Sequence, residues 1–212
     1  MKAKLPGTVE KDREAGEPLS ASRLVGFSDG VFAVVITLLV LNIQVPSEAI
    51  SLRTLIGQQF PNYVIFIATF AMVGIKWLNH HRLFALIRRV DTTLNILNLL
   101  LLLGICAVPF TAAMIAKYMT TSDAAFASMI YGMVWTINGF LYTAILFYAR
   151  KKGFVESIPG TGKMAALYVI GPLGYLVAIG VSFWNIYAGI ALYLAIVLLY
   201  IPPQRLPESW PD

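Results

Sequence analysis

The chain has 212 residues, of which 58% are hydrophobic and only 13% are charged, and its mean hydropathy is +0.73. Because an ordinary soluble domain carries about 25% charged residues, this composition excludes that class and predicts one compact polytopic membrane bundle. The net charge of +5 does not indicate a nucleic-acid partner, because the basic residues flank apolar runs, as expected for a chain oriented in a lipid bilayer.

Residues 1–20 are polar and mixed in charge, and no small-residue cleavage site follows the first apolar run. We therefore expect a flexible cytosolic N-terminal arm rather than a signal peptide. The first apolar run covers about residues 21–45 and ends at Pro46. It contains Asp29, the one acidic residue that we expect well inside a span. A carboxylate at that depth is energetically expensive, which indicates a functional or a structural polar site.

A membrane-crossing helix needs about 20 predominantly apolar residues. After the first run the sequence offers five more, at about residues 60–80, 93–117, 125–149, 164–183 and 185–202, and Pro202-Pro203 ends the last one. The segment 47–59 is predicted to be a short interfacial helix. The predicted fold class is therefore all-α: a polytopic membrane protein with six transmembrane helices in residues 21–203 and a short cytosolic tail in residues 204–212.

The Lys and Arg residues are distributed unequally between the two sides of this topology. Of the 16 basic residues, only Arg53 and Lys117 fall on one side, and all the others fall on the opposite side. The side with the excess faces the cytosol by the positive-inside rule. We therefore predict that both termini are cytosolic and that Asp29 lies near the cytosolic end of its span.

The sequence offers little chemistry for catalysis. His80 and His81 are the only histidines, Cys106 is the only cysteine, and no spacing resembles a zinc site or a Gly-rich phosphate loop. An aspartyl protease needs two carboxylates at one site, whereas this membrane interior offers one. We therefore expect no enzymatic activity, no metal site and no cofactor. Few polar groups are available at mid-depth to bind a polar solute, which argues against an ordinary solute transporter.

One face of the first span is apolar over several turns. Val34, Thr37, Leu38 and Leu41 share this face at helical spacing, and Phe27 and Gly30 continue it toward the cytosol. Two interpretations are open: the face packs against other spans, or it lines a pore.

The polar residues at the start of this span need partners in a low-dielectric setting. The cytosolic end of the second span lies at a similar depth and offers several. We predict that these groups form a network that fixes the first helix, made of Arg23, Phe27, Ser28, Asp29, Trp77, His80 and His81. The alternative for the two histidines is an interfacial position facing lipid headgroups.

These motifs together resemble the Phe-Ser-Asp family of potassium channels. The resemblance rests on Arg23, four residues before Phe27-Ser28-Asp29, and on the following apolar helix, the six predicted spans and the second-span end with Trp77, His80 and His81. Animal members of that family lie in endosomes and lysosomes and carry two six-span repeats, whereas bacterial members carry one. This chain has one repeat and resembles the bacterial form, which implies a location in the bacterial inner (plasma) membrane.

The resemblance implies a homotetramer in which four copies of the first span line a central pore for K⁺ and other monovalent cations. It places the constriction at Val34, with Thr37 or Leu38 and then Leu41 further out. The predicted polar network, in contrast, makes Asp29 an anchor of the pore helix that does not coordinate the ion. Val34 is smaller than the isoleucine or leucine expected there, which favours a wider ring. An apolar ring closes by dewetting or passes partly hydrated ions. We therefore expect leak-like, weakly to moderately K⁺-selective conduction.

Two other functions remain open from the sequence. One is a proton-coupled or small-solute transporter in which Asp29 and His80 or His81 form a proton relay. The other is a non-conducting membrane scaffold that contains a structural polar cluster. Flux measurements in liposomes distinguish all three.

Overall fold

The computed structural model describes residues 21–46, 50–155 and 161–201, and for residues 161–168 it describes the backbone only. The predicted N-terminal arm (1–20) and C-terminal tail (204–212) lie outside the described residues. The described part is helical, as predicted, apart from one isolated bridge between Ile87 and Val155. Its elements are α1 (Ala21–Leu38), the 3-10 helix η1 (Leu39–Asn42), α2 (Leu52–Gln58), α3 (Phe60–Ala85), α4 (Thr92–Tyr118), α5 (Ala124–Lys151), α6 (Thr161–Ser182) and α7 (Ile186–Leu198).

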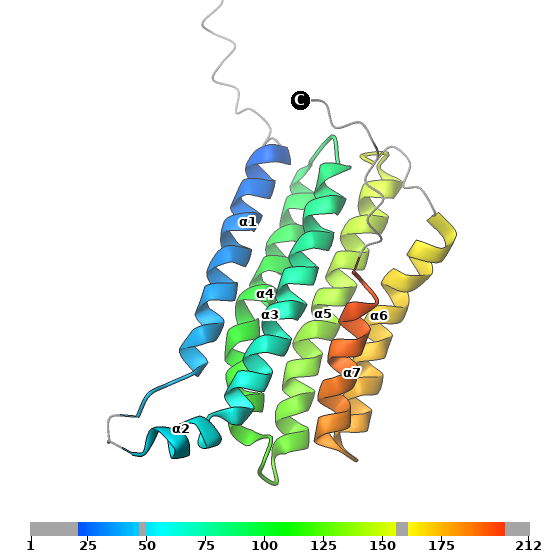
Figure 1. Ribbon diagram of the computed structural model, residues 1–212. Helices are drawn as coiled ribbons and strands as arrows, with labels where there is room; N and C mark the ends of the chain where they lie inside the picture. Colours follow the sequence, from blue (N-terminus) through cyan, green and yellow to red (C-terminus); the bar gives the residue numbers. More distant parts are fainter. Residues whose placement is uncertain (1–20, 47–49, 156–160, 202–212) are drawn as a thin grey trace, which may run out of the picture.

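Polar residues just before three of the helices determine where those helices begin. Ser51, Asp91 and Asn185 precede α2, α4 and α7, and each accepts a hydrogen bond from the backbone N–H three residues later. Such N-caps satisfy one of the backbone donors that have no partner within the first turn of a helix. The interfacial helix predicted within 47–59 corresponds to α2, which lies across one end of the bundle (Figure 1).

The long helices run side by side, and α1 lies at the edge of the bundle (Figure 1). Apart from η1, which continues it, α1 packs against α3 and α4. Helix α5 packs extensively against both α4 and α6, while α7 contacts α3, α5 and α6. One side of α1 is therefore covered within the chain, and its other side has no neighbouring helix among the described residues.

Four stretches are long and apolar enough to cross a membrane: α1 with η1, α3, α4 and α5. Where side chains are described, the last two helices contribute shorter apolar stretches, Val169–Ser182 and Ile186–Leu198. The prediction of six transmembrane helices is therefore supported for four and stays a prediction for the last two. The second predicted span is longer than expected, because α3 continues through His81 and Arg82 to Ala85.

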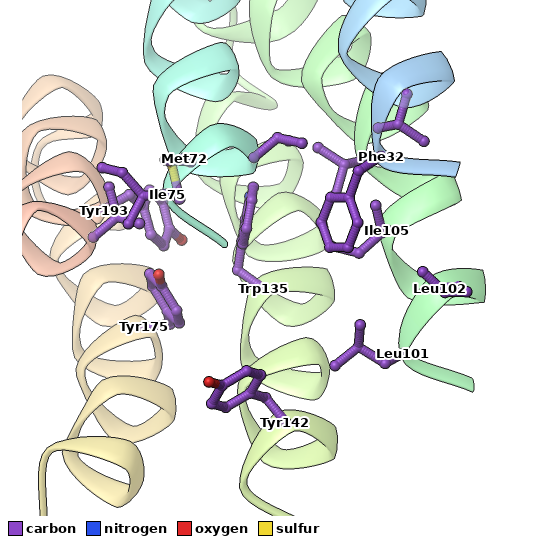
Figure 2. Close-up of a cluster of buried hydrophobic side chains, with 14 of the residues drawn as sticks. Phe32, Met72, Ile75, Leu101, Leu102, Ile105, Trp135, Tyr142, Tyr175 and Tyr193 are labelled. Carbon is purple, nitrogen blue, oxygen red and sulfur yellow. The ribbon is translucent and has the colours of Figure 1, made fainter. Parts of the chain in front are cut away.

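Aromatic side chains fill the centre of the bundle. In the view of Figure 2, Trp135 of α5 stands between Tyr175 and Tyr193 on one side and Phe32 and Ile105 on the other. All five belong to one buried cluster. Such interlocking packing contributes many small dispersion contacts, which matter in a bilayer because lipid tails remove most of the hydrophobic driving force between helices. The packing joins α1 and α4 to the other half of the bundle.

Candidate functional site: an apolar helix face with a polar anchor

Helix α1 has two distinct faces. Its buried face carries Leu24, Ser28, Phe32 and Val35, and Leu39 continues it into η1, at the three- and four-residue spacing of one helix side. The opposite face is exposed and consists of Phe27, Gly30, Val34, Thr37, Leu38 and Leu41. Every residue of the stripe predicted from the sequence therefore lies on the uncovered face. Val34 is 56% exposed and Leu41 is 62% exposed, so neither packs within its own chain.

Thr37 is the polar residue of this face. Its hydroxyl donates a hydrogen bond of 2.7 Å to the Val34 carbonyl on the preceding turn. A hydroxyl has one donor hydrogen and two acceptor lone pairs, so this bond leaves the oxygen able to accept. Thr37 thus offers an electron-rich oxygen to whatever faces α1, with apolar side chains on both sides of it along the helix.

A chain of buried hydrogen bonds connects α1 to α4 and α3. The Ser28 hydroxyl donates to the Leu24 carbonyl at 2.8 Å, and Asn98 Nδ2 of α4 donates to Ser28 Oγ at 3.0 Å. Asn98 Oδ1 lies 2.8 Å from His80 Nε2 of α3. Because Asn98 Oδ1 is an acceptor, His80 carries a hydrogen on Nε2. All three side chains are fully buried, and each bond has a defined donor direction.

His80 is held by ring contacts as well. Its ring stacks on Phe84 with a centroid distance of 4.4 Å and lies 5.4 Å from the ring of Phe32 on α1. Its second ring nitrogen, Nδ1, is buried and has no hydrogen-bond partner among the described residues. Ring contacts and one hydrogen bond therefore connect His80 to both α1 and α4.

Asp29 makes a separate set of contacts on the neighbouring side of α1. Trp77 Nε1 of α3 donates to Asp29 Oδ1 at 2.8 Å, and His81 Nδ1 lies 3.9 Å from Asp29 Oδ2. The His81 and Asp29 side chains are 44% and 36% exposed, so this contact borders the surface of the single chain. The Trp77 and His81 rings also lie 5.9 Å apart.

The predicted network is therefore arranged as two neighbouring groups of contacts. Ser28 and His80 belong to the buried group, and Asp29, Trp77 and His81 belong to the half-exposed group. The other two predicted members, Arg23 and Phe27, are exposed. Within the described part of the chain, the ion pair recorded for Asp29 is with His81 and not with Arg23.

Sequence reasoning missed Asn98, which joins Ser28 to His80. The signal was present, because Asn95 and Asn98 are amides within an otherwise apolar run, and polar groups inside a span usually have a structural or functional role. A further contact fixes the far end of the same helix. Asn42 Nδ2, at the end of η1, donates to the Pro109 carbonyl of α4 at 3.3 Å. The apolar exposed face therefore lies between two polar attachments to the bundle.

The arrangement separates two tasks. The polar groups attach one side of α1 to α3 and α4, while the opposite side presents apolar side chains and one hydroxyl oxygen. Among the described residues, no cluster of His, Cys, Asp and Glu could hold a metal ion. This geometry suits the wall of an ion path better than a binding pocket for a polar solute.

Comparisons with known proteins find channels that are similar to this chain. Residues 23–109 match the family model described as the endosomal/lysosomal potassium channel TMEM175. A potassium channel of Streptomyces collinus is 33% identical over 187 residues, which cover 85% of this chain and 91% of that protein. The crystal structure of a lysosomal potassium-selective channel TMEM175 homolog from Chamaesiphon minutus matches with a TM-score of 0.75 at 29% identity, covering 85% of this chain and 95% of that one.

An animal relative matches over a shorter stretch. The endosomal/lysosomal proton channel TMEM175 of Bos taurus is 39% identical over 103 residues, which are 44% of this chain and 22% of that protein. The bacterial relatives, in contrast, align over nearly their whole length. The resemblance inferred from the motifs is thereby confirmed, and this chain is a multi-pass membrane protein that belongs to the TMEM175 family.

Proposed function

We propose that this protein is a potassium channel in which four copies of the chain surround a central pore lined by α1. The observation that carries the proposal is the uncovered face of α1, which is apolar, continuous and opposite the anchored face. One helix cannot enclose a path for ions. The α1 helices of several subunits, arranged around a common axis, are therefore needed to form the pore. The kinship to potassium channels of bacteria supports the same conclusion. Catalysis has no part in this proposal.

In this assembly, Val34, Leu38 and Leu41 form apolar rings, and Thr37 forms a polar ring among them. Apolar rings exclude water when narrow and admit partly hydrated ions when wide. K⁺ gives up part of its hydration shell at lower cost than Na⁺, so rings of this kind favour K⁺ modestly. Val34 is a small residue for a constriction. We therefore propose leak-like conduction with weak to moderate K⁺ selectivity and with some passage of other monovalent cations.

The proposed topology has six spans, with both termini in the cytosol of a bacterium and the bundle in its inner membrane. The distribution of basic residues supports the orientation. Asp29 then lies near the cytosolic mouth and acts through its contacts with Trp77 and His81, outside the ion path.

K⁺ flux and oligomeric mass test this function together. The full chain is purified, its mass in detergent is determined by light scattering, and K⁺ efflux from liposomes is followed after a proton carrier dissipates the voltage. We expect a tetramer and an efflux driven by the K⁺ gradient alone, without saturation at low K⁺ concentration. A monomer, or a tetramer that passes no K⁺, would overturn the proposal, and the latter would indicate the scaffold.

A second candidate function is proton-linked transport. The observation that favours it is the half-exposed pair of titratable side chains, Asp29 and His81, with 3.9 Å between Oδ2 and Nδ1. The animal relative described as a proton channel points in the same direction. In this case flux of K⁺ or of a small solute would depend on an opposing proton gradient, and replacing Asp29 by Asn would abolish that coupling.

A further inference from the structure

A second candidate site, with a mostly apolar lining, lies on the other side of α3 from the pore-lining helix. It is a cavity of about 40 Å³ between α3, α5, α6 and α7. Its polar lining comes mainly from Lys76, Asn79, Trp135, Tyr142, Tyr175 and Tyr200. Among the described residues that line the cavity, none belongs to α1 or α4, so the cavity is separate from the pore face and from its anchor.

The walls of this cavity are closely packed. Gly139 of α5 faces Pro172 of α6, and a Cβ atom at Gly139 would lie only 2.6 Å from the Pro172 ring. The two helices therefore approach each other as closely as their backbones allow, which is how small residues act in membrane bundles. A water molecule needs at least about 10–15 Å³ of such space, so the cavity has room for a few waters or for one small ion with a water.

Among the described residues, no carboxylate compensates the charge of the Lys76 ammonium. Its Nζ donates to the Asn138 carbonyl at 3.2 Å and lies 4.5 Å from the centre of the Tyr142 ring. Neither group carries a negative charge. The ion pair recorded within the described part of the chain joins His81 and Asp29, and does not involve Lys76. An ammonium group has three donor hydrogens, so the bond to the Asn138 carbonyl leaves donor capacity, and Lys76 is one of the residues that line the cavity.

The other polar groups of the lining do not supply an anionic partner. Asn79 Nδ2 donates to the carbonyls of Ile75 and Tyr200, and the Tyr142 hydroxyl donates to the Asn79 carbonyl. No carboxylate is among the described lining residues. An ammonium inside a membrane bundle is expensive unless a counter-charge accompanies it. The positive potential excludes K⁺, and the small volume excludes a lipid headgroup or a large organic acid.

We propose that this cavity is a binding site for a small inorganic anion, of the size and charge of chloride, held by the Lys76 ammonium. The ammonium donates to the anion, and the aromatic side chains of the lining shield the ion pair from lipid. Lys76 and Trp77 are neighbours in sequence, and Trp77 contacts Asp29 on α1. The anion therefore stabilises the helix that supports the pore-lining helix, without entering the ion path.

Thermal unfolding of the purified full chain in detergent tests the site. Melting is recorded in potassium gluconate, chloride and bromide at constant K⁺ concentration and constant ionic strength. We expect chloride and bromide to raise the melting temperature by a few degrees. A halide concentration ten times its Kd increases the ratio of folded to unfolded protein about elevenfold. Gluconate is too large for the cavity and serves as the reference anion.

Two lysine variants show whether the effect belongs to this cavity. Lys76→Met should abolish the difference between halide and gluconate. Lys152→Met is the matched control, because Lys152 also lies over a tyrosine ring, 5.7 Å from the centre of Tyr148, but at the exposed end of α5. This control should retain the full halide effect. A halide effect that is equal in wild type and Lys76→Met, or absent from wild type, overturns the proposal.

Crystals of the wild-type protein grown in bromide provide a second test, which needs no variant and therefore remains valid if Lys76→Met fails to fold. We expect an anomalous scattering peak in contact with Lys76 Nζ at bromide concentrations that also shift the melting temperature. A cavity that contains water only, without that peak, would overturn the proposal even if Lys76→Met were unstable. Neither readout depends on ion conduction, so failure of the anion site and failure of the channel function are distinguishable.

Discussion

The indole N–H of Trp77 donates a hydrogen bond of 2.8 Å to Asp29 Oδ1 and so joins α1 to the C-terminal part of α3. Because the acceptor is a carboxylate, this bond is charge-assisted and stronger than a bond between neutral groups. We therefore expect the carboxylate near the start of α1 to fix the orientation of the helix, a role that remains a prediction.

Replacing Trp77 by Phe should weaken this attachment while keeping an aromatic ring. Hydrogen bonds to charged groups contribute about 1.5–3 kcal/mol, and we expect the lower end because Asp29 is partly exposed. For a chain of this size, that loss lowers the melting temperature by roughly 3–6 °C. Trp184→Phe is the control, since Trp184 is 92% exposed and should tolerate the change. Equal melting of the two variants would contradict the role of Trp77.

Replacing Asn98 by Leu should be more damaging. The variant leaves Ser28 Oγ without its donor and His80 Nε2 without its acceptor, and each orphaned buried group costs about 1–3 kcal/mol. Asn95→Leu is a matched control one turn earlier on α4, because Asn95 Oδ1 is buried without a hydrogen-bond partner among the described residues. Melting and tetramer yield measure the effect. If Asn95→Leu destabilised the protein as much as Asn98→Leu, the buried chain of hydrogen bonds would have no special importance.

Truncating the apolar rings should loosen the constriction. Leu38→Ala or Leu41→Ala widens the proposed pore and is expected to raise basal current or Na⁺ permeability several-fold, measured by flux or by reversal potential in bilayers. Leu173→Ala is the control, since the exposed fraction of Leu173 lies between those of Leu38 and Leu41, but Leu173 belongs to α6, which does not pack against α1 in the described part of the chain. Unchanged selectivity and current in both pore variants would show that α1 does not line the pore.

Thr37 provides a more specific test of whether α1 forms the wall of the pore. Thr37→Val keeps the shape of the side chain and removes the hydroxyl oxygen, so K⁺ permeability relative to Na⁺ should fall. Thr121→Val is a close control, because Thr121 is also exposed and also donates to the carbonyl three residues earlier, at 2.8 Å. It lies in the turn between α4 and α5, away from α1. Unaltered selectivity in Thr37→Val would exclude this oxygen from the ion path.

The acid stability of the α3–α4 connection should depend on Tyr148. Its hydroxyl donates to Asp91 Oδ2 at 2.6 Å, and this bond, with the N–H of Leu94, lowers the pKa of Asp91 below its usual value near 3.8. A lowered pKa in the folded state gives stability that is present above pH 3.8 and is lost as the pH falls through the folded-state pKa. Tyr148→Phe should therefore reduce stability at neutral pH and weaken its loss below pH 4, as measured by melting between pH 3 and 7. Tyr118→Phe should leave the profile unchanged.

The sequence predicted the location of the polar anchor by a simple argument about depth. The start of the first span and the end of the second lie at the same side of the bundle, so Asp29 and Trp77 were expected to be neighbours. Helical spacing predicted that Val34, Thr37, Leu38 and Leu41 share one face of α1, but it left open whether that face packs against other spans; in the structure the face is exposed. The sequence placed both histidines in one network and did not assign a partner to either. In the structure both take part, His80 with Asn98 and His81 with Asp29.

Other features needed three-dimensional information. Asn98 comes from a helix that the sequence did not place next to α1, and an amide in an apolar run carries no sign of its partner. Arg23 was expected beside Asp29 because opposite charges attract, yet it is six residues away and exposed, whereas Trp77 and His81 come from the helix that packs on α1. Lys76 looked like one more basic residue of the cytosolic side, and only the packing of α3 against α5 places it beside a cavity.

The attachment of α1 at both ends restricts how a channel of this design can open. Ser28 and Asp29 hold its beginning, and Asn42 holds the far end of η1 against α4. Twisting or sliding α1 by itself would break bonds at both ends at once. Changes in pore diameter should therefore arise either from rotamer changes of leucine side chains or from a rigid-body motion of α1, α3 and α4 together. The first of these occurs in nanoseconds and the second in microseconds to milliseconds. The rate of opening and closing transitions in single-channel recordings would show which of these two motions controls conduction.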